Sequence, residues 1–148
     1  MTHSEIIQIL SGFIGSIGFA FLFNIRGWRL VVTAFGGFLS WALFCVLNNF
    51  INSEPVNYFI VALIISIYAE IMARLLKTPT TTFITTALIP LIPGSSLYYT
   101  MAYAFQSNSE SFLERGVYTL QLSSALALGI IIATTLARIR FKKGDINV

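Results

Sequence analysis

Two prolines three residues apart, followed by a glycine and two serines, form the stretch of the sequence best suited to chemistry. Pro90 and Pro93 lack backbone N–H donors and cannot both occupy a regular helix interior, and Gly94 adds backbone freedom. Ser95 or Ser96 is a suitable N-cap for a helix that restarts there. The stretch therefore predicts two half-helices inside one long apolar segment.

The start of the second half-helix is a candidate binding site. Its free N–H groups and positive dipole end suit a carboxylate. We therefore expect Gly94, Ser95 and Ser96 to contact an anionic part of a substrate. The alternative, which the spacing leaves open, is a plain proline kink of the kind found in many membrane helices.

An acidic and a basic residue lie four positions apart in another apolar segment. Glu70 and Arg74 would share one helix face and could form an ion pair. An ionisable residue at such depth is costly, and its default interpretation is functional, for example proton transfer in a coupled transporter. The alternative is a structural pair in which Arg74 reaches to the membrane interface.

A run of threonines follows this pair. The stretch Thr78-Pro79-Thr80-Thr81-Thr82, with Thr85 and Thr86, leads into the segment that contains the two prolines. These hydroxyls could line a hydrophilic path. The alternative is that they bond back to the carbonyl groups of their own helix.

Several kinds of catalytic and metal site are excluded by residue counts. The single cysteine, Cys45, and the single histidine, His3, can form neither an intrachain disulfide nor a Cys/His zinc site. The apolar segments contain no aspartate, and the chain has neither an H-E-x-x-H motif nor a Walker-type loop. We expect no enzyme, no catalytic residue, no cofactor and no metal.

The elements that must position these residues are transmembrane helices. Hydrophobic residues make up 56% of the 148 residues and charged residues 10%, whereas a soluble domain is about a quarter charged. A helix needs about 20 apolar residues to cross a bilayer. Five segments qualify, at residues 6–23, 30–50, 58–76, 82–105 and 117–137. The sequence predicts one all-α transmembrane domain over residues 1–148, a bundle of about five helices, with the fourth broken at Pro90–Gly94 near mid-membrane.

The basic residues predict the orientation of the chain. Short loops that carry Lys and Arg face the cytoplasm. Eight of the nine basic residues fall on one side of a five-span bundle: Arg26, Arg29, Arg74, Lys77, Arg138, Arg140, Lys142 and Lys143. The other side carries Arg115 with four glutamates: Glu5, Glu54, Glu110 and Glu114. We expect a multi-pass protein of the cell (inner or plasma) membrane with its N-terminus outside and its C-terminus cytoplasmic. The net charge of +3 is too small and too scattered to indicate nucleic-acid binding.

Small residues recur at four-residue spacing on three of the segments. These stripes are Gly12, Ser16 and Ala20; Gly36 and Ser40; and Ala125, Gly129, Ala133 and Ala137. Small side chains let membrane helices approach closely. The stripes predict helix contacts inside the chain, and the alternative is that the last stripe faces another subunit, giving an oligomer.

Three blocks of the sequence resemble the threonine/serine exporter family, in particular its small subunit or C-terminal half. They are Ala20-Phe-Leu-Phe-Asn24 with Arg26, Leu30, Gly36-Gly37 and Trp41; Ala69-Glu70-Ile-Met-Ala73-Arg74-Leu-Leu-Lys77-Thr78-Pro79; and Ile89-Pro90-Leu-Ile-Pro93-Gly94-Ser95-Ser96-Leu97-Tyr98-Tyr99-Thr100-Met101. The chain is also similar to the small subunit of two-component succinate exporters. The resemblance runs through nearly the whole chain in order.

The resemblance implies secondary export of a small hydrophilic metabolite, threonine or serine, together with a larger membrane partner subunit. It implies a substrate-binding or gating role for Glu70, Arg74, Pro90, Pro93, Gly94, Ser95, Ser96 and Tyr98. Two halves of five spans each would have opposite orientations, the geometry of an inverted repeat with a midplane site. The alternatives are a dicarboxylate (succinate) exporter subunit and a membrane scaffold that transports nothing.

Overall fold

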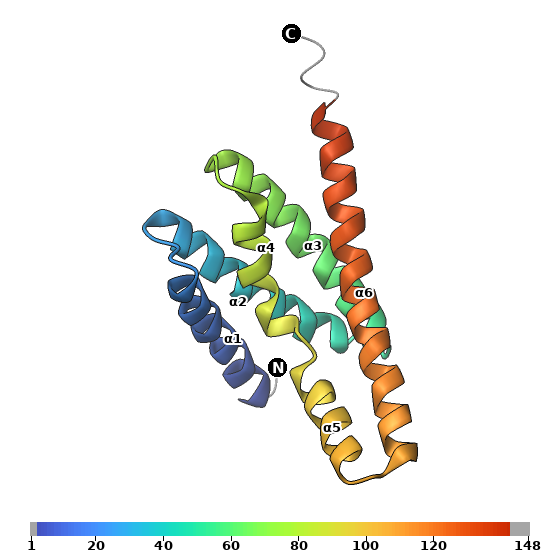
Figure 1. Ribbon diagram of the computed structural model, residues 1–148. Helices are drawn as coiled ribbons and strands as arrows, with labels where there is room; N and C mark the ends of the chain where they lie inside the picture. Colours follow the sequence, from blue (N-terminus) through green and yellow to red (C-terminus); the bar gives the residue numbers. More distant parts are fainter. Residues whose placement is uncertain (1–2, 143–148) are drawn as a thin grey trace.

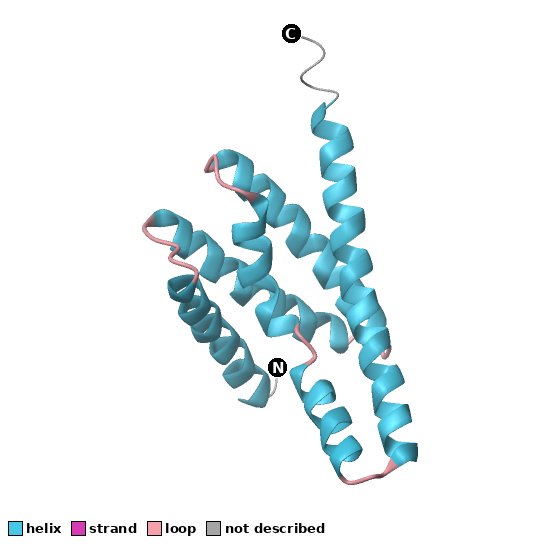
Figure 2. Cartoon of the chain, viewed as in Figure 1, coloured by secondary structure: helices cyan, strands magenta, loops and turns pink. Residues whose placement is uncertain are grey.

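The computed structural model describes residues 3–142, and this part of the chain is helical apart from short turns (Figure 1). In chain order the elements are α1 (His3–Leu22), α2 (Trp28–Asn48), α3 (Glu54–Leu75), α4 (Thr80–Leu88), the 3₁₀ turn η1 (Ile89–Leu91), α5 (Gly94–Phe105) and α6 (Ser109–Lys142). Figure 2 shows no strand in the described residues. The predicted all-α membrane fold is confirmed.

Helix α2 lies between α1 and α4, and two adjacent glycines allow both neighbours to approach. A side chain at Gly37 would collide with Ser16 of α1. A Cβ at Gly36 would lie 3.0 Å from the Cβ of Ala87 in α4 and 3.1 Å from the ring of Tyr68 in α3. The small-residue stripes predicted on the first two segments are therefore contacts inside the chain.

Helices α3 and α6 run in the same direction and form the most extensive helix pair of the fold. A Cβ at Gly129 would lie 2.7 Å from the backbone oxygen of Phe59 and 2.8 Å from the Cβ of Ala62. Ala133, one turn further along, is fully buried. The stripe on the last segment thus faces α3, so the structure supports the prediction of an intrachain contact over that of a contact with another subunit.

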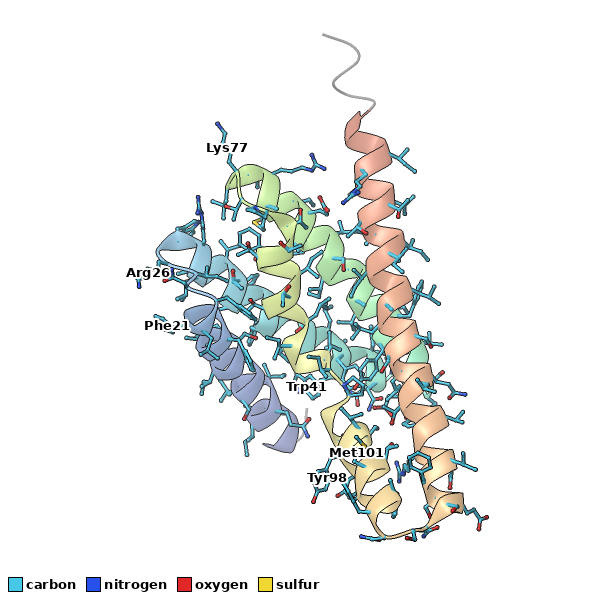
Figure 3. All side chains as sticks on the ribbon, viewed as in Figure 1. Phe21, Arg26, Trp41, Lys77, Tyr98 and Met101 are labelled. Atoms are coloured by element: carbon cyan, nitrogen blue, oxygen red, sulfur yellow. The ribbon has the colours of Figure 1, made fainter. Side chains whose placement is uncertain are left out.

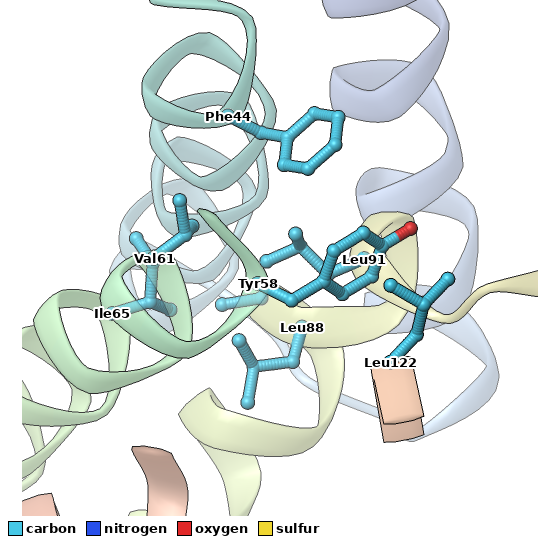
Figure 4. Packing of buried hydrophobic residues seen from close by; sticks show 8 residues of the cluster. Phe44, Tyr58, Val61, Ile65, Leu88, Leu91 and Leu122 are labelled. Atoms are coloured by element: carbon cyan, nitrogen blue, oxygen red, sulfur yellow. The ribbon is translucent and has the colours of Figure 1, made fainter. Parts of the chain in front are cut away.

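Side chains from α2, α3, η1 and α6 meet in the main hydrophobic core (Figure 4). The rings of Phe44 and Tyr58 pack edge to face with centroids 5.1 Å apart. Leu91, in the 3₁₀ turn, is fully buried, and Leu122 closes the cluster from α6. The break in the fourth segment is therefore fixed by core packing on its α4 side.

Helix α6 is much longer than the helices beside it. The 20 to 22 residues of α1, α2 and α3 correspond to about 30 to 33 Å, close to the hydrocarbon thickness, whereas the 34 residues of α6 correspond to about 51 Å. Its first turns extend beyond the other helices and pair with α5, which packs against α6 (Figure 1). The connection expected at Gln106–Gly116 is shorter in the structure, because Asn108 accepts a hydrogen bond from the N–H of Ser111 and α6 begins at Ser109.

Three helices of the described region are long and apolar enough to cross a membrane: Trp28–Asn48, Glu54–Leu75 and Ser109–Ile139. The apolar stretches Ile6–Leu22 and Thr80–Leu91 are shorter. The fourth expected segment is the one that departs most from a simple span, because η1 and an extended Ile92 divide it.

Candidate functional site

Charged residues divide the bundle into two ends. Arg26 and Lys77 lie at one end, which we call the basic end, and Tyr98 and Met101 lie towards the other (Figure 3). We call the end that carries Glu54 the acidic end. Lys143 and the side chains of Glu5, Arg140 and Lys142, which the sequence also assigns to these ends, lie outside the described residues.

The predicted break of the fourth segment is present. Helix α4 ends in η1, Ile92 is extended, and α5 begins at Gly94 with Pro93 at the N-cap position. No side chain caps α5, so the prediction that Ser95 or Ser96 is the N-cap was wrong. Both serines lie in the first turn instead, because the carbonyl of Pro93 already accepts the N–H of Leu97.

Pro90 lies on the α1 side of the break. A Cβ at Gly12 would lie 3.6 Å from the Cβ of Pro90 and 3.5 Å from the Cβ of Trp41. Pro90 also lines a small cavity of about 250 Å³ together with Gln8 and Ser11. Gly12 is the tenth of the 20 residues of α1, so Pro90 lies level with the middle of that helix.

A larger cavity opens where α5 starts, at the acidic end. Its volume is about 820 Å³, within the range of small-molecule sites. The residues that line it are Glu54, Ser95, Ser96, Leu113, Glu114, Arg115, Val117, Tyr118 and Gln121. We call it the acidic-end cavity. Two carboxylates, one guanidinium and two serine hydroxyls thus surround one space in a chain that is otherwise mainly apolar.

A hydrogen bond joins α3 to α6 in the wall of this cavity. The hydroxyl of Tyr118 donates to Oε2 of Glu54. Glu54 lies in the first turn of α3, where the helix dipole favours a negative charge. The carboxylate is therefore held at a defined position in the wall.

Two threonines hold α5 against α6 beside the cavity. The hydroxyl oxygens of Thr100 and Thr119 are 3.1 Å apart in a buried contact. Each hydroxyl is also within hydrogen-bond distance of the carbonyl one turn earlier, that of Ser96 for Thr100 and that of Arg115 for Thr119. The contact therefore fixes the walls that carry Ser96 and Arg115 relative to each other.

The acidic residue predicted from sequence lies elsewhere. Glu70 is 6% exposed, and its Oε2 is 3.5 Å from a guanidinium nitrogen of Arg74. The predicted i,i+4 pair is present, near the basic end. Sixteen residues of α3 separate Glu70 from Glu54, about 24 Å along the helix. The predicted site residues therefore form two groups, with Ser95 and Ser96 at one end and Glu70 with Arg74 at the other.

Some threonines of the run line a cavity, and one bonds back to its own helix. Thr81, Thr82 and Thr85 line a cavity of about 260 Å³ with Phe23. The hydroxyl of Thr86 instead donates to the carbonyl of Thr82 at 3.3 Å.

Tyr98 and Gly94 face away from the acidic-end cavity. Tyr98 is 69% exposed and its ring packs edge to face on Tyr99, with centroids 5.5 Å apart. No atom of the chain lies within 4 Å of a Cβ built on Gly94, so helix packing does not require a glycine there. The two residues mark the exposed side of α5.

The sequence-based reasoning missed several residues of the acidic-end cavity as site residues: Glu54, Glu114, Arg115, Tyr118 and Gln121. Glu54, Glu114 and Arg115 entered the sequence-based reasoning only as charges that predict the orientation of the chain. A signal was present, because Glu114 and Arg115 are neighbours of opposite sign beside an apolar segment. Their proximity to Ser95 and Ser96 depends on the α5–α6 contact, which the pattern did not predict.

Comparison with known proteins supports a transport role for this arrangement. A family model described as Threonine/Serine exporter, ThrE, matches residues 8–136, most of the chain. Comparisons with curated proteins and with solved structures found no match. The matched region includes every residue that lines the acidic-end cavity or the threonine-lined cavity, and the Glu70–Arg74 pair.

Proposed function

Because the chain belongs to the threonine/serine exporter family, a family of transporters and not of enzymes, we propose that it forms one membrane half of a secondary exporter of small hydrophilic metabolites of the threonine or serine type. The observation that carries the proposal is the acidic-end cavity, about 820 Å³ in volume, at the break of the fourth segment. A broken helix in a membrane protein requires a protein-lined or water-filled space, and half-helix ends serve as substrate sites in transporters.

The chain would cross the cell membrane five times, with its N-terminus outside. Helices α1, α2, α3 and α6 would each make one crossing, and α4 with α5 would make the remaining one. Support comes from Arg26 and Lys77, which share one end of the bundle, because loops rich in basic residues face the cytoplasm. The acidic-end cavity would then open outwards and the threonine-lined cavity inwards.

A larger membrane subunit of the same family would complete the exporter. Five crossings per half would give the two halves opposite orientations, with the substrate path between them. The exposed apolar side chains of α5 support such a contact. Leu97, Met101 and Phe105 are 52%, 55% and 88% exposed, and together they form an apolar face that a partner subunit would cover.

Efflux of labelled threonine, serine and succinate from preloaded cells would test the proposal. The cells would lack their own exporters and would carry the chain with and without its presumed large subunit. We expect efflux of threonine or serine only when both chains are in the membrane. Efflux of succinate alone would indicate a dicarboxylate exporter, and efflux of none of the three would favour a scaffold role.

A further inference from the structure

We infer that the carboxylate of Glu54, which accepts the hydroxyl of Tyr118, recognises the ammonium group of a zwitterionic substrate and makes the exporter select amino acids over anions of the same size. The inference rests on the proposed transport function. It concerns a residue that neither the sequence motifs nor the family match assigns to the site. It depends on the hydrogen bond between Tyr118 and Glu54 and on the charged residues that line the acidic-end cavity.

The carboxylate of Glu54 keeps free acceptor capacity towards the cavity. A carboxylate has about four lone-pair sites, and the hydroxyl of Tyr118 occupies one of them. Both residues line the acidic-end cavity, so the remaining lone pairs can accept donors from a bound molecule. An ammonium group offers three donors and a positive charge, and hydrogen bonds between charged groups are about twice as strong as neutral ones.

Other residues that line the cavity suit a carboxylate. Arg115 contributes a guanidinium group, and Ser95 and Ser96 contribute hydroxyls and the unpaired N–H groups of the first turn of α5. Glu114 also lines the cavity and adds a second negative charge. The cavity thus combines a site for each end of a zwitterion, whereas a dicarboxylate would bring a second negative charge to Glu54.

A structural role is the competing explanation for the hydrogen bond. Glu54 and Tyr118 join α3 to α6, and the bond could do no more than hold these helices together. Glu54→Gln separates the two roles, because the amide oxygen still accepts the tyrosine hydroxyl while the negative charge is lost. Tyr118→Phe does the reverse, since it removes the bond and keeps the carboxylate.

The test compares serine with glycerate, in which a hydroxyl replaces the ammonium group of serine. Proteoliposomes would contain the chain with its large subunit, and transport of each labelled compound would be measured at equal protein content. We expect the wild type to prefer serine by about tenfold or more, the loss expected when one charge-assisted contact is missing. Glu54→Gln should lower that preference by about tenfold, and Tyr118→Phe should leave it within about threefold.

Two further variants serve as controls. Glu54→Asp retains the charge and should keep most of the preference. Glu110→Gln removes an acidic residue from the first turn of α6 that does not line the cavity, and should behave as the wild type.

The possible outcomes separate the inference from the proposed function. A wild type that transports glycerate as fast as serine overturns the inference without any variant. An unchanged preference for serine in Glu54→Gln, with loss of transport of both substrates in Tyr118→Phe, also overturns it, because that combination indicates a structural bond. Failure of the wild type to transport any compound would instead contradict the proposed function.

Discussion

The two ends of the bundle hold their charges in different ways. At the basic end, Glu70 is paired with Arg74 of the same helix, one turn away. At the acidic end, Glu54 of α3 meets Tyr118 of α6 across a cavity that α5 also lines. A pair within one helix needs only that helix, whereas the cavity exists only when three helices are assembled. The acidic end should therefore be the more sensitive to helix packing.

The largest effect is expected from separating α3 from α6. Gly129→Val would place side-chain atoms against the backbone oxygen of Phe59 and the Cβ of Ala62. Overpacking of this kind costs about 3 kcal/mol. We expect the apparent melting temperature in detergent to fall by about 5–10 °C, with loss of transport.

Gly18→Val is the matched control, because a Cβ at Gly18 would meet nothing within 4 Å. It should stay within about 2 °C of the wild type. Equal destabilisation by the two variants would contradict a close α3–α6 contact.

The second prediction tests the guanidinium group that lines the acidic-end cavity. Arg115→Gln removes the one guanidinium group that lines it, and affinity for threonine should fall by about tenfold or more. The melting temperature should change little because Arg115 is exposed. Binding to the purified two-subunit complex would be measured by calorimetry, and unchanged affinity would place the substrate elsewhere.

The third prediction concerns the basic end. Glu70→Gln keeps the size of a buried side chain and removes its charge. If Glu70 moves protons during export, transport should fall by about tenfold while the melting temperature stays within about 5 °C. A normal transport rate combined with a lower melting temperature would indicate a purely structural ion pair.

The smallest effect is expected from the hydroxyl pair that holds α5 on α6. Thr119→Val removes one hydroxyl of the Thr100–Thr119 contact at nearly constant volume. The loss should be about 1 kcal/mol, seen as roughly fivefold faster amide hydrogen exchange in α5. Thr135→Val, on the exposed side of the same helix, should leave the exchange of α5 unchanged.

Features that depend on one helix were predictable from the sequence. The apolar segments predict α1 to α4, the two prolines predict the break, and the four-residue spacing predicts the Glu70–Arg74 pair. The acidic-end cavity was not predictable, because it requires α5 to fold back onto an extended α6. The N-cap prediction was wrong because α5 begins before the two serines. The carbonyl of Pro93 already accepts a hydrogen bond in its first turn.

Because α6 is long, a small tilt of this helix moves the residues far from its contact with α3. Helix α6 contacts α3 closely at Gly129, and Tyr118 lies eleven residues away, about 16 Å along the helix. A tilt of roughly 10° about that point would move Tyr118 by about 3 Å, enough to break its bond to Glu54 and change the width of the acidic-end cavity. A displacement of α6 near the basic end would thus reach the acidic end of the bundle, with no helix unwound.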